Sequence, residues 1–121
     1  MKKWKINFSK EAKDNLHEIR NYVAVDLKNP IGAKNLIRRI REEILNLNQM
    51  PERFPVYDRE PWKSRGLRWM AVDNYTAFYI TDKSFQTVTI FSVVYSKRDM
   101  ANVLSEKYFE IAVPYNIFFS H

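Results

Sequence analysis

Five basic residues lie at or near the ends of predicted strands, where they could hold phosphates: Lys63, Arg65, Arg68, Lys97 and Arg98. The last two directly follow a run of strand-forming residues, Thr87 to Tyr95. An arginine at the end of a strand is held rigidly, and its guanidinium can form charge-assisted hydrogen bonds to phosphate oxygens. The alternative is that Lys97 and Arg98 are ordinary surface residues at the point where a strand stops.

Such residues could build an RNA-cutting site that needs no metal. The ribose 2′-OH attacks the neighbouring phosphate, and positive side chains stabilise the extra negative charge of the transition state. Removing one such contact typically costs about 10²–10³ in rate. Aromatic residues lie among the basic ones and could stack bases. However, Trp69, Tyr79 and Tyr95 also suit a core, and we expect at least two of them there.

Other kinds of catalytic site find little support in the composition. The chain has 121 residues, no cysteine, two glycines and two histidines, His17 and His121. Without cysteine there is neither a disulfide nor a thiol nucleophile. The histidines lack a zinc-binding spacing, and no Ser-His-Asp set is evident. We therefore expect no metal and no cofactor.

The formal net charge of +6 suits a nucleic acid or an acidic protein as partner. Apolar residues make up 45% of the chain, which is typical of a globular domain. No apolar run approaches the roughly 20 residues of a membrane helix, and no secretory signal is evident at the N-terminus. We expect a cytoplasmic protein that does not enter a membrane.

Hydrophobic periodicity predicts a strand followed by two helices. Apolar and polar residues alternate over positions 4–8, and Ser9 is placed to cap a helix. Asn29-Pro30 interrupts that helix and begins another, because proline is tolerated only in a first helical turn. The apolar stripe of the second helix is the clearest in the chain: Ala33, Leu36, Ile37, Ile40, Ile44 and Leu47.

Three strand-like runs follow a proline-rich loop: Leu67 to Val72, Tyr75 to Thr81 and Thr87 to Tyr95. Asp73-Asn74 is short enough for a tight turn between the first two. The order β-α-α-β-β-β predicts an α+β domain, with an N-terminal helical hairpin packed on a small, mostly antiparallel sheet. A short C-terminal helix is expected at Asp99 to Glu106.

Alternation along the first of these three strands predicts where Arg68 points. If Leu67, Trp69 and Ala71 face the helices, Arg68 projects from the opposite, uncovered face. That face would then be a groove with basic edges.

The order of elements and four segments resemble the RelE/ParE superfamily, the toxins of bacterial type II toxin–antitoxin systems. The segments are "FSKEAKDNLHEIRNYV", "NPIGAKNLIRRIREEILNLNQMPERFPVY", "EPWKSRGLRWMAVDNYTAFYI" and "VTIFSVVYSKRDM". The resemblance covers about Trp4 to Leu104. It implies a toxin domain at residues 1–104 and a C-terminal extension of unknown role at residues 105–121.

The superfamily has two functional kinds, and the resemblance implies different sites for them. RelE-like toxins cleave mRNA in the ribosomal A site, whereas ParE-like toxins poison DNA gyrase and are not known as nucleases. For a RelE-like toxin, Arg68 and Arg98 would be catalytic, and Lys63, Arg65 and Lys97 would bind nucleic acid.

Two positions depart from the RelE pattern. Thr76 stands where a further arginine would be expected, and Leu104 stands where a tyrosine would be. Tyr108, one helical turn further on, could substitute for that tyrosine. These departures weaken the resemblance to the nucleases without removing it.

The resemblance also implies a cognate antitoxin as partner. Arg38, Arg39 and Arg41 of the second helix could contact an acidic antitoxin, could touch ribosomal RNA, or could simply be solvated. Three hypotheses follow, in order of preference. The first is a ribosome-dependent endoribonuclease acting on ribosome-bound mRNA, the second a non-enzymatic gyrase poison, and the third an inactive module that only binds antitoxin.

Overall fold

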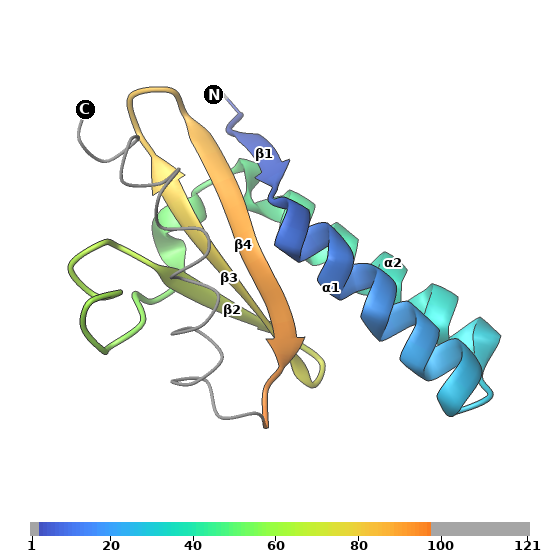
Figure 1. Cartoon of the computed structure of the whole chain (residues 1–121). Coiled ribbons are helices and arrows are strands. Elements are labelled where there is room, and N and C mark those ends of the chain that lie inside the picture. The colour runs from blue at the N-terminus through green and yellow to red at the C-terminus, as the bar shows by residue number, and fades with distance from the viewer. Residues whose placement is uncertain (1–2, 98–121) are drawn as a thin grey trace.

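The fold is a four-stranded sheet with a hairpin of two helices against one face (Figure 1). The computed structural model describes residues 3–97. Its helices and strands are β1 (Lys5–Phe8), α1 (Lys10–Asn21), α2 (Pro30–Leu45), β2 (Arg68–Val72), β3 (Tyr75–Asp82) and β4 (Thr87–Tyr95). A π-helical turn, Tyr22–Asp26, continues α1, and two 3-10 turns, Asn46–Asn48 and Pro51–Arg53, follow α2. The predicted order and α+β class are confirmed, while the predicted helix at Asp99 to Glu106 lies outside the described residues.

The sheet has the strand order β1-β4-β3-β2. β2, β3 and β4 form an antiparallel meander, and β1 pairs in parallel with β4, with Ile6 opposite Val88. In the turn between β2 and β3, Asp73 has φ 52°. Aspartate tolerates this left-handed conformation, as the sequence predicts for a tight hairpin.

Ser9 joins the start of α1 to the edge of β4. Its hydroxyl accepts from the backbone N–H of Ala12 at 3.0 Å, which is an N-cap. The same hydroxyl donates to the carbonyl oxygen of Phe91 at 2.7 Å. β1 ends at Phe8, opposite Ile90, so the cap also serves a strand edge that β1 does not cover.

Asn15, six residues after Ser9, serves the same edge of β4. It is 5% exposed, and its side-chain oxygen accepts from the buried backbone N–H of Val93 at 2.9 Å. Asn15→Ala leaves that N–H without this acceptor and is expected to lower the free energy of unfolding by about 1–2 kcal/mol. Urea denaturation followed by circular dichroism measures the change. The control is Asn21→Ala, at an exposed position of α1; equal effects of the two substitutions would contradict the prediction.

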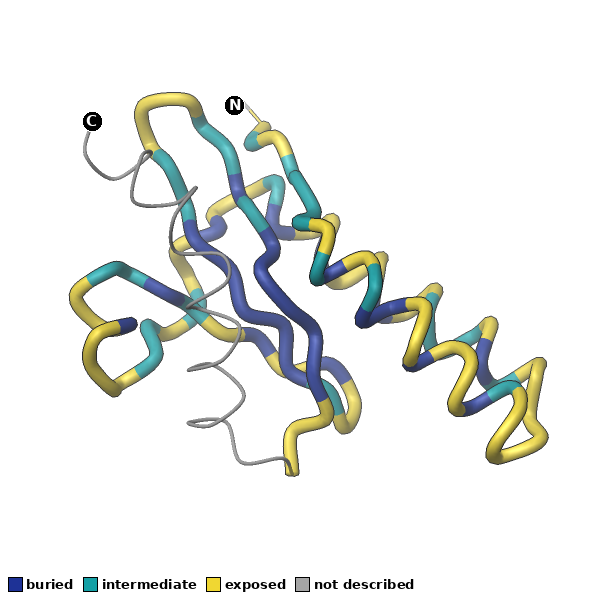
Figure 2. The backbone as a smooth tube through the Cα atoms, viewed as in Figure 1, coloured by how far each residue is buried: buried dark blue, intermediate teal, exposed yellow. Residues whose placement is uncertain are grey.

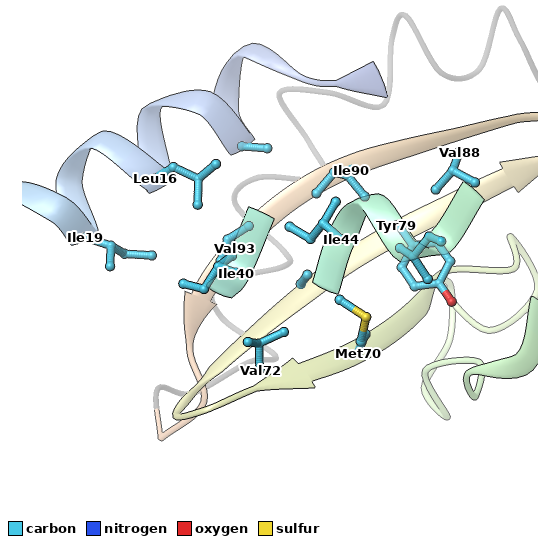
Figure 3. Packing of buried hydrophobic residues seen from close by; sticks show 13 residues of the cluster. Leu16, Ile19, Ile40, Ile44, Met70, Val72, Tyr79, Val88, Ile90 and Val93 are labelled. Atoms are coloured by element: carbon cyan, nitrogen blue, oxygen red, sulfur yellow. The ribbon is translucent and has the colours of Figure 1, made fainter. Parts of the chain in front are cut away.

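The main core fills the space between the helical hairpin and the sheet (Figure 3). Its largest contributors are Leu16 and Ile19 of α1, Ile40 and Ile44 of α2, and Met70, Val72, Tyr79, Val88, Ile90 and Val93 of the sheet. Ile40, Ile44 and Tyr79 are 0% exposed. The apolar stripe predicted for the second helix therefore faces the sheet.

The opposite face of the sheet carries a second apolar cluster, so the central strands are buried along much of their length (Figure 2). The cluster consists of Trp62, Leu67, Phe78, Ile80, Phe91 and Val94. A register shift lies between β3 and β4, where Phe78 pairs with Ser92 but Tyr79 pairs with Ile90. Phe91 is thus an extra residue on β4, which is the arrangement of a β-bulge.

Candidate functional site

The side chain of Arg68 ties the start of β2 to the segment around the 3-10 turn Pro51–Arg53. Its side chain is only 20% exposed. One terminal nitrogen donates to the carbonyl oxygens of Glu52, at 3.0 Å, and Phe54, at 2.5 Å. Its other terminal nitrogen lies 3.9 Å from a carboxylate oxygen of Glu52. This guanidinium is engaged in holding the chain together.

The predicted direction of Arg68 is wrong. Met70 and Val72, which share its face by alternation, belong to the core beneath the helices, at 2% and 8% exposed. Leu67 belongs to the second cluster, and Trp69 is 38% exposed. The alternation is as predicted, but its phase is inverted, because a strand with apolar residues on both faces does not specify which face the helices cover.

Tyr79 lies beside Arg68 on the neighbouring strand and is the buried aromatic of this region. Its hydroxyl donates to the carbonyl oxygen of Pro51 at 2.6 Å. Burial raises the pKa of Tyr79 to about 12, and the positive charges of Arg68 and Arg53 oppose that rise. Tyr79 is thus a core residue, as the sequence allows. In contrast, Trp69 and Tyr95 are 38% and 40% exposed, so the expectation that two of the three are core is wrong.

A pH prediction follows from the raised pKa of Tyr79. A tyrosine with a pKa above its unfolded value of about 10 stabilises the fold below pH 10, and this stabilisation is lost as the pH rises through 12. We expect Tyr79 to ionise near pH 12. Tyrosinate absorbance of the wild type minus that of Tyr79→Phe should give one group titrating near pH 12, with folding checked by circular dichroism. A difference curve centred at pH 10 would contradict this.

Arg68 begins β2 level with the middle of β3 and β4, whereas Lys97 lies past the end of β4. Arg68 pairs with Tyr79, and Tyr79 pairs with Ile90. Lys97 is seven residues beyond Ile90 in the sequence. Lys97 is exposed just past the end of β4. Arg98 follows it in the sequence and lies outside the described residues.

Lys63 and Arg65 lie in the loop before β2, close to the second cluster. Lys63 is 58% exposed, with its ammonium 3.2 Å from a carboxylate oxygen of Asp58. Arg65 is half-buried. In the same loop, Trp62 and Tyr57 pack their rings edge to face, with centroids 5.9 Å apart. The nucleic-acid-binding roles of Lys63, Arg65 and Lys97 stay predictions.

Thr76, at the position where a RelE-like toxin would carry an arginine, is a buried part of the sheet. It is 7% exposed, and its hydroxyl is 2.7 Å from that of Ser96. This contact joins the start of β3 to the turn that follows β4. Leu104 and Tyr108 lie outside the described residues.

The three arginines of α2 divide into two groups. Arg39 forms an ion pair with Asp73 of the β2–β3 turn, at 2.7 and 3.1 Å, and so braces the hairpin against the sheet. Arg38 and Arg41 instead line a groove beside α1. The arginine-rich surface expected from the sequence is therefore two surfaces with different surroundings.

Metal and membrane sites find no support within residues 3–97. No group of three or more histidine, aspartate or glutamate side chains there could hold a metal ion. No helix in that range is long and apolar enough to cross a membrane.

Comparisons with known proteins agree with this architecture. Residues 6–100 match the family model described as the ParE toxin of the type II toxin–antitoxin system parDE. No individual curated protein matches the chain at a significant level.

Three solved structures share the fold. The RelBE2 toxin–antitoxin complex of Mycobacterium tuberculosis has a TM-score of 0.60 and 21% identity, covering 78% of this chain and 93% of that one. A chain of the chromosomal ParDE system of P. aeruginosa has a TM-score of 0.64 and 18% identity, covering 78% and 97%. An arginine-to-alanine double mutant of E. coli RelE in the free state has a TM-score of 0.60 and 12% identity, covering 90% and 98%.

Proposed function

This chain belongs to the ParE toxin family, within the RelE/ParE superfamily of type II toxin–antitoxin toxins, and from that premise we propose that it inhibits DNA gyrase by binding it. In this proposal the toxin is not an enzyme. Its surfaces recognise a protein target. Its positive charge speeds association with that target and does not stabilise a transition state at a phosphate.

The observation that supports this proposal is that Arg68, one of the two arginines that a nuclease site would need, is bound within the fold. Arg68 is held by the carbonyl oxygens of Glu52 and Phe54 on the helical side of the sheet. Lys97, the neighbour of Arg98 in the sequence, lies past the end of β4, whereas Arg68 is level with the middle of that strand. A transition state requires donors preorganised around one phosphate. The pairing register does not bring Arg68 and Lys97 together in this way.

We also propose a cognate antitoxin as the direct partner. Two of the structurally similar proteins come from toxin–antitoxin systems, RelBE2 and ParDE, and the first is a toxin–antitoxin complex. A formal net charge of +6 suits an acidic antitoxin.

Ribosome-dependent mRNA cleavage is the alternative function. The exposed Lys97 at the end of β4, directly before Arg98, favours it. In that case Arg98 would bind the scissile phosphate, with Lys63, Arg65 and Lys97 on the surrounding RNA. Arg68 could join them only through the nitrogens that do not donate to its two carbonyl partners.

The two functions are separated by paired assays on the purified full chain. We expect inhibition of supercoiling by purified DNA gyrase, relieved by prior addition of the cognate antitoxin. On programmed ribosomes we expect mRNA to stay intact, as mapped by primer extension. Discrete cuts within the A-site codon would overturn the proposal in favour of the nuclease. Inactivity in both assays would favour a module that only binds antitoxin.

A further inference from the structure

An open pocket of about 660 Å³ lies between the helical hairpin and one end of the sheet. One wall is formed by α1 and the π-helical turn that continues it. The other wall is formed by the start of β3 and the end of β4. Neither of the two functions considered above uses this pocket.

Three tyrosines from different elements line the pocket. Tyr22 comes from the π-helical turn, Tyr75 from the start of β3 and Tyr95 from the end of β4. The rings of Tyr75 and Tyr95 pack edge to face, with centroids 5.7 Å apart. Burial raises the pKa of Tyr75, and the charges of Tyr95 and Tyr22 add to that rise, so the three hydroxyls lie near one another. Tyr22 and Tyr95 are 51% and 40% exposed, which leaves much of each ring accessible to a ligand.

Glu18 gives the pocket a negative charge. Among the described lining residues it is the one with a charged side chain. Its neighbours three and four positions away on the helix are Asp14, Asn15, Asn21 and Tyr22, none of which is basic. The chain as a whole has 20 lysines and arginines against 14 acidic residues. The sign of the pocket is therefore opposite to that of the protein.

The edge of β4 adds backbone acceptors on the same side. β1 pairs with β4 only as far as Ile90. Beyond that point the backbone of Val93 faces the open edge, since its N–H donates to Asn15 of α1. Residues two apart in a strand face the same way, so the carbonyl oxygens of Val93 and Tyr95 both point toward this edge. Both residues also line the pocket.

A guanidinium group suits these surroundings better than an anion or an apolar group. It donates hydrogen bonds and accepts none, so it matches a carboxylate and carbonyl oxygens. It stacks on aromatic rings and is more weakly hydrated than an ammonium group. An anion would meet Glu18 and the carbonyl oxygens with repulsion. An apolar group would gain nothing from Glu18.

We propose that this pocket binds an arginine side chain presented by a partner protein. The guanidinium lies against the rings of Tyr22 and Tyr95 and forms an ion pair with Glu18. Proteins carry this group as arginine, so the occupant is a protein segment. The inference goes beyond the proposed function and does not depend on whether the toxin acts on gyrase or on ribosomes.

A pair of short peptides tests the pocket. The probe is an acetylated, amidated pentapeptide with one arginine between glycines. Its match carries citrulline, a neutral urea of nearly the same shape. The side-chain amide signals of Asn15 and Asn74, which line the pocket, report binding in NMR spectra of the ¹⁵N-labelled full chain. The arginine peptide should bind at least ~5-fold more tightly than the citrulline peptide. Equal affinity, or no shift of these two signals, overturns the proposal.

Matched variants of the chain locate the binding. Glu18→Gln and Tyr22→Leu should each weaken the arginine peptide about threefold, whereas Tyr22→Phe keeps the ring and should stay within about twofold. Glu43→Gln removes the same charge from an exposed position of α2, and Phe85→Leu removes an exposed ring from the β3–β4 turn. Neither control residue lines the pocket, and each control should change affinity less than about twofold. Equal losses in the pocket variants and the controls overturn the assignment to this pocket.

A third pentapeptide, with glutamate in place of arginine, tests the sign of the ligand. It should bind more weakly than the citrulline peptide because Glu18 repels it. Tighter binding of the glutamate peptide than of the arginine peptide would mean that the pocket takes an anion and would overturn the proposal. These assays use neither gyrase nor ribosomes, so their failure is distinguishable from failure of the proposed function.

Discussion

Ile40→Ala is expected to lower the free energy of unfolding by about 2–5 kcal/mol. Ile40 is 0% exposed and lies in α2 at the centre of the core beneath the hairpin (Figure 3). Alanine removes apolar contacts and leaves a cavity between the helix and the sheet, which close-packed neighbours fill only in part. A domain of this kind has only about 5–15 kcal/mol in total, so the loss is a large share of its stability.

Chemical denaturation gives the size of this effect, and growth arrest on expression gives its consequence. The matched control is Ile31→Ala, in the same helix but 74% exposed, which is expected to change stability by less than about 0.5 kcal/mol. The control should arrest growth as the wild type does, whereas Ile40→Ala should arrest it weakly. Similar stabilities for the two variants would mean that α2 does not pack on the sheet as described.

The helical hairpin was accessible from sequence because its signals are local. Ser9 and Asn29 are N-caps in the structure, accepting from the backbone N–H groups of Ala12 and Gly32. Pro30 occupies the first turn of α2. Each signal involves residues three or four apart, where the geometry of a single helical turn decides the outcome. The start of α2 follows from Asn29 and Pro30 alone.

The phase of β2 was not accessible, because it depends on contacts distant in sequence. Leu67 and Met70 are both apolar and both buried, yet they belong to different clusters on opposite faces. Only the placement of α2 against Met70 decides that Arg68 points to the helical side. A period of two predicts that residues alternate, but not which set meets the helices.

The candidate site shows the same division between local and distant information. Basic residue types near strand ends can be recognised in the sequence, but their separation depends on the register of the meander, in which Arg68 is level with the middle of β4 and Lys97 lies past its end. The ion pair of Arg39 with Asp73 spans 34 residues. No local pattern separates Arg39 from Arg38 and Arg41, although the first braces the fold and the others line the groove.

Arg68→Ala is expected to lower the free energy of unfolding by about 2–3 kcal/mol, because two carbonyl oxygens lose a charged donor. The carbonyl of Phe54 is the partly buried one of the two and bears most of the cost. Folded protein should still inhibit gyrase within about twofold of the wild type, since the guanidinium serves the fold rather than the target. Denaturation midpoints and supercoiling assays below the unfolding temperature measure the two effects separately.

Arg59→Ala is the control for Arg68→Ala, because it removes the same charge from an exposed position in the loop before β2. We expect it to change stability by less than about 0.5 kcal/mol. The catalytic hypothesis requires instead that Arg68→Ala abolish mRNA cleavage in protein that is still folded. One terminal nitrogen of the Arg68 guanidinium is held on two backbone carbonyls, so its removal costs stability whatever the target is. Stability and target inhibition measured on the same folded variant therefore separate a structural role of this arginine from a catalytic one.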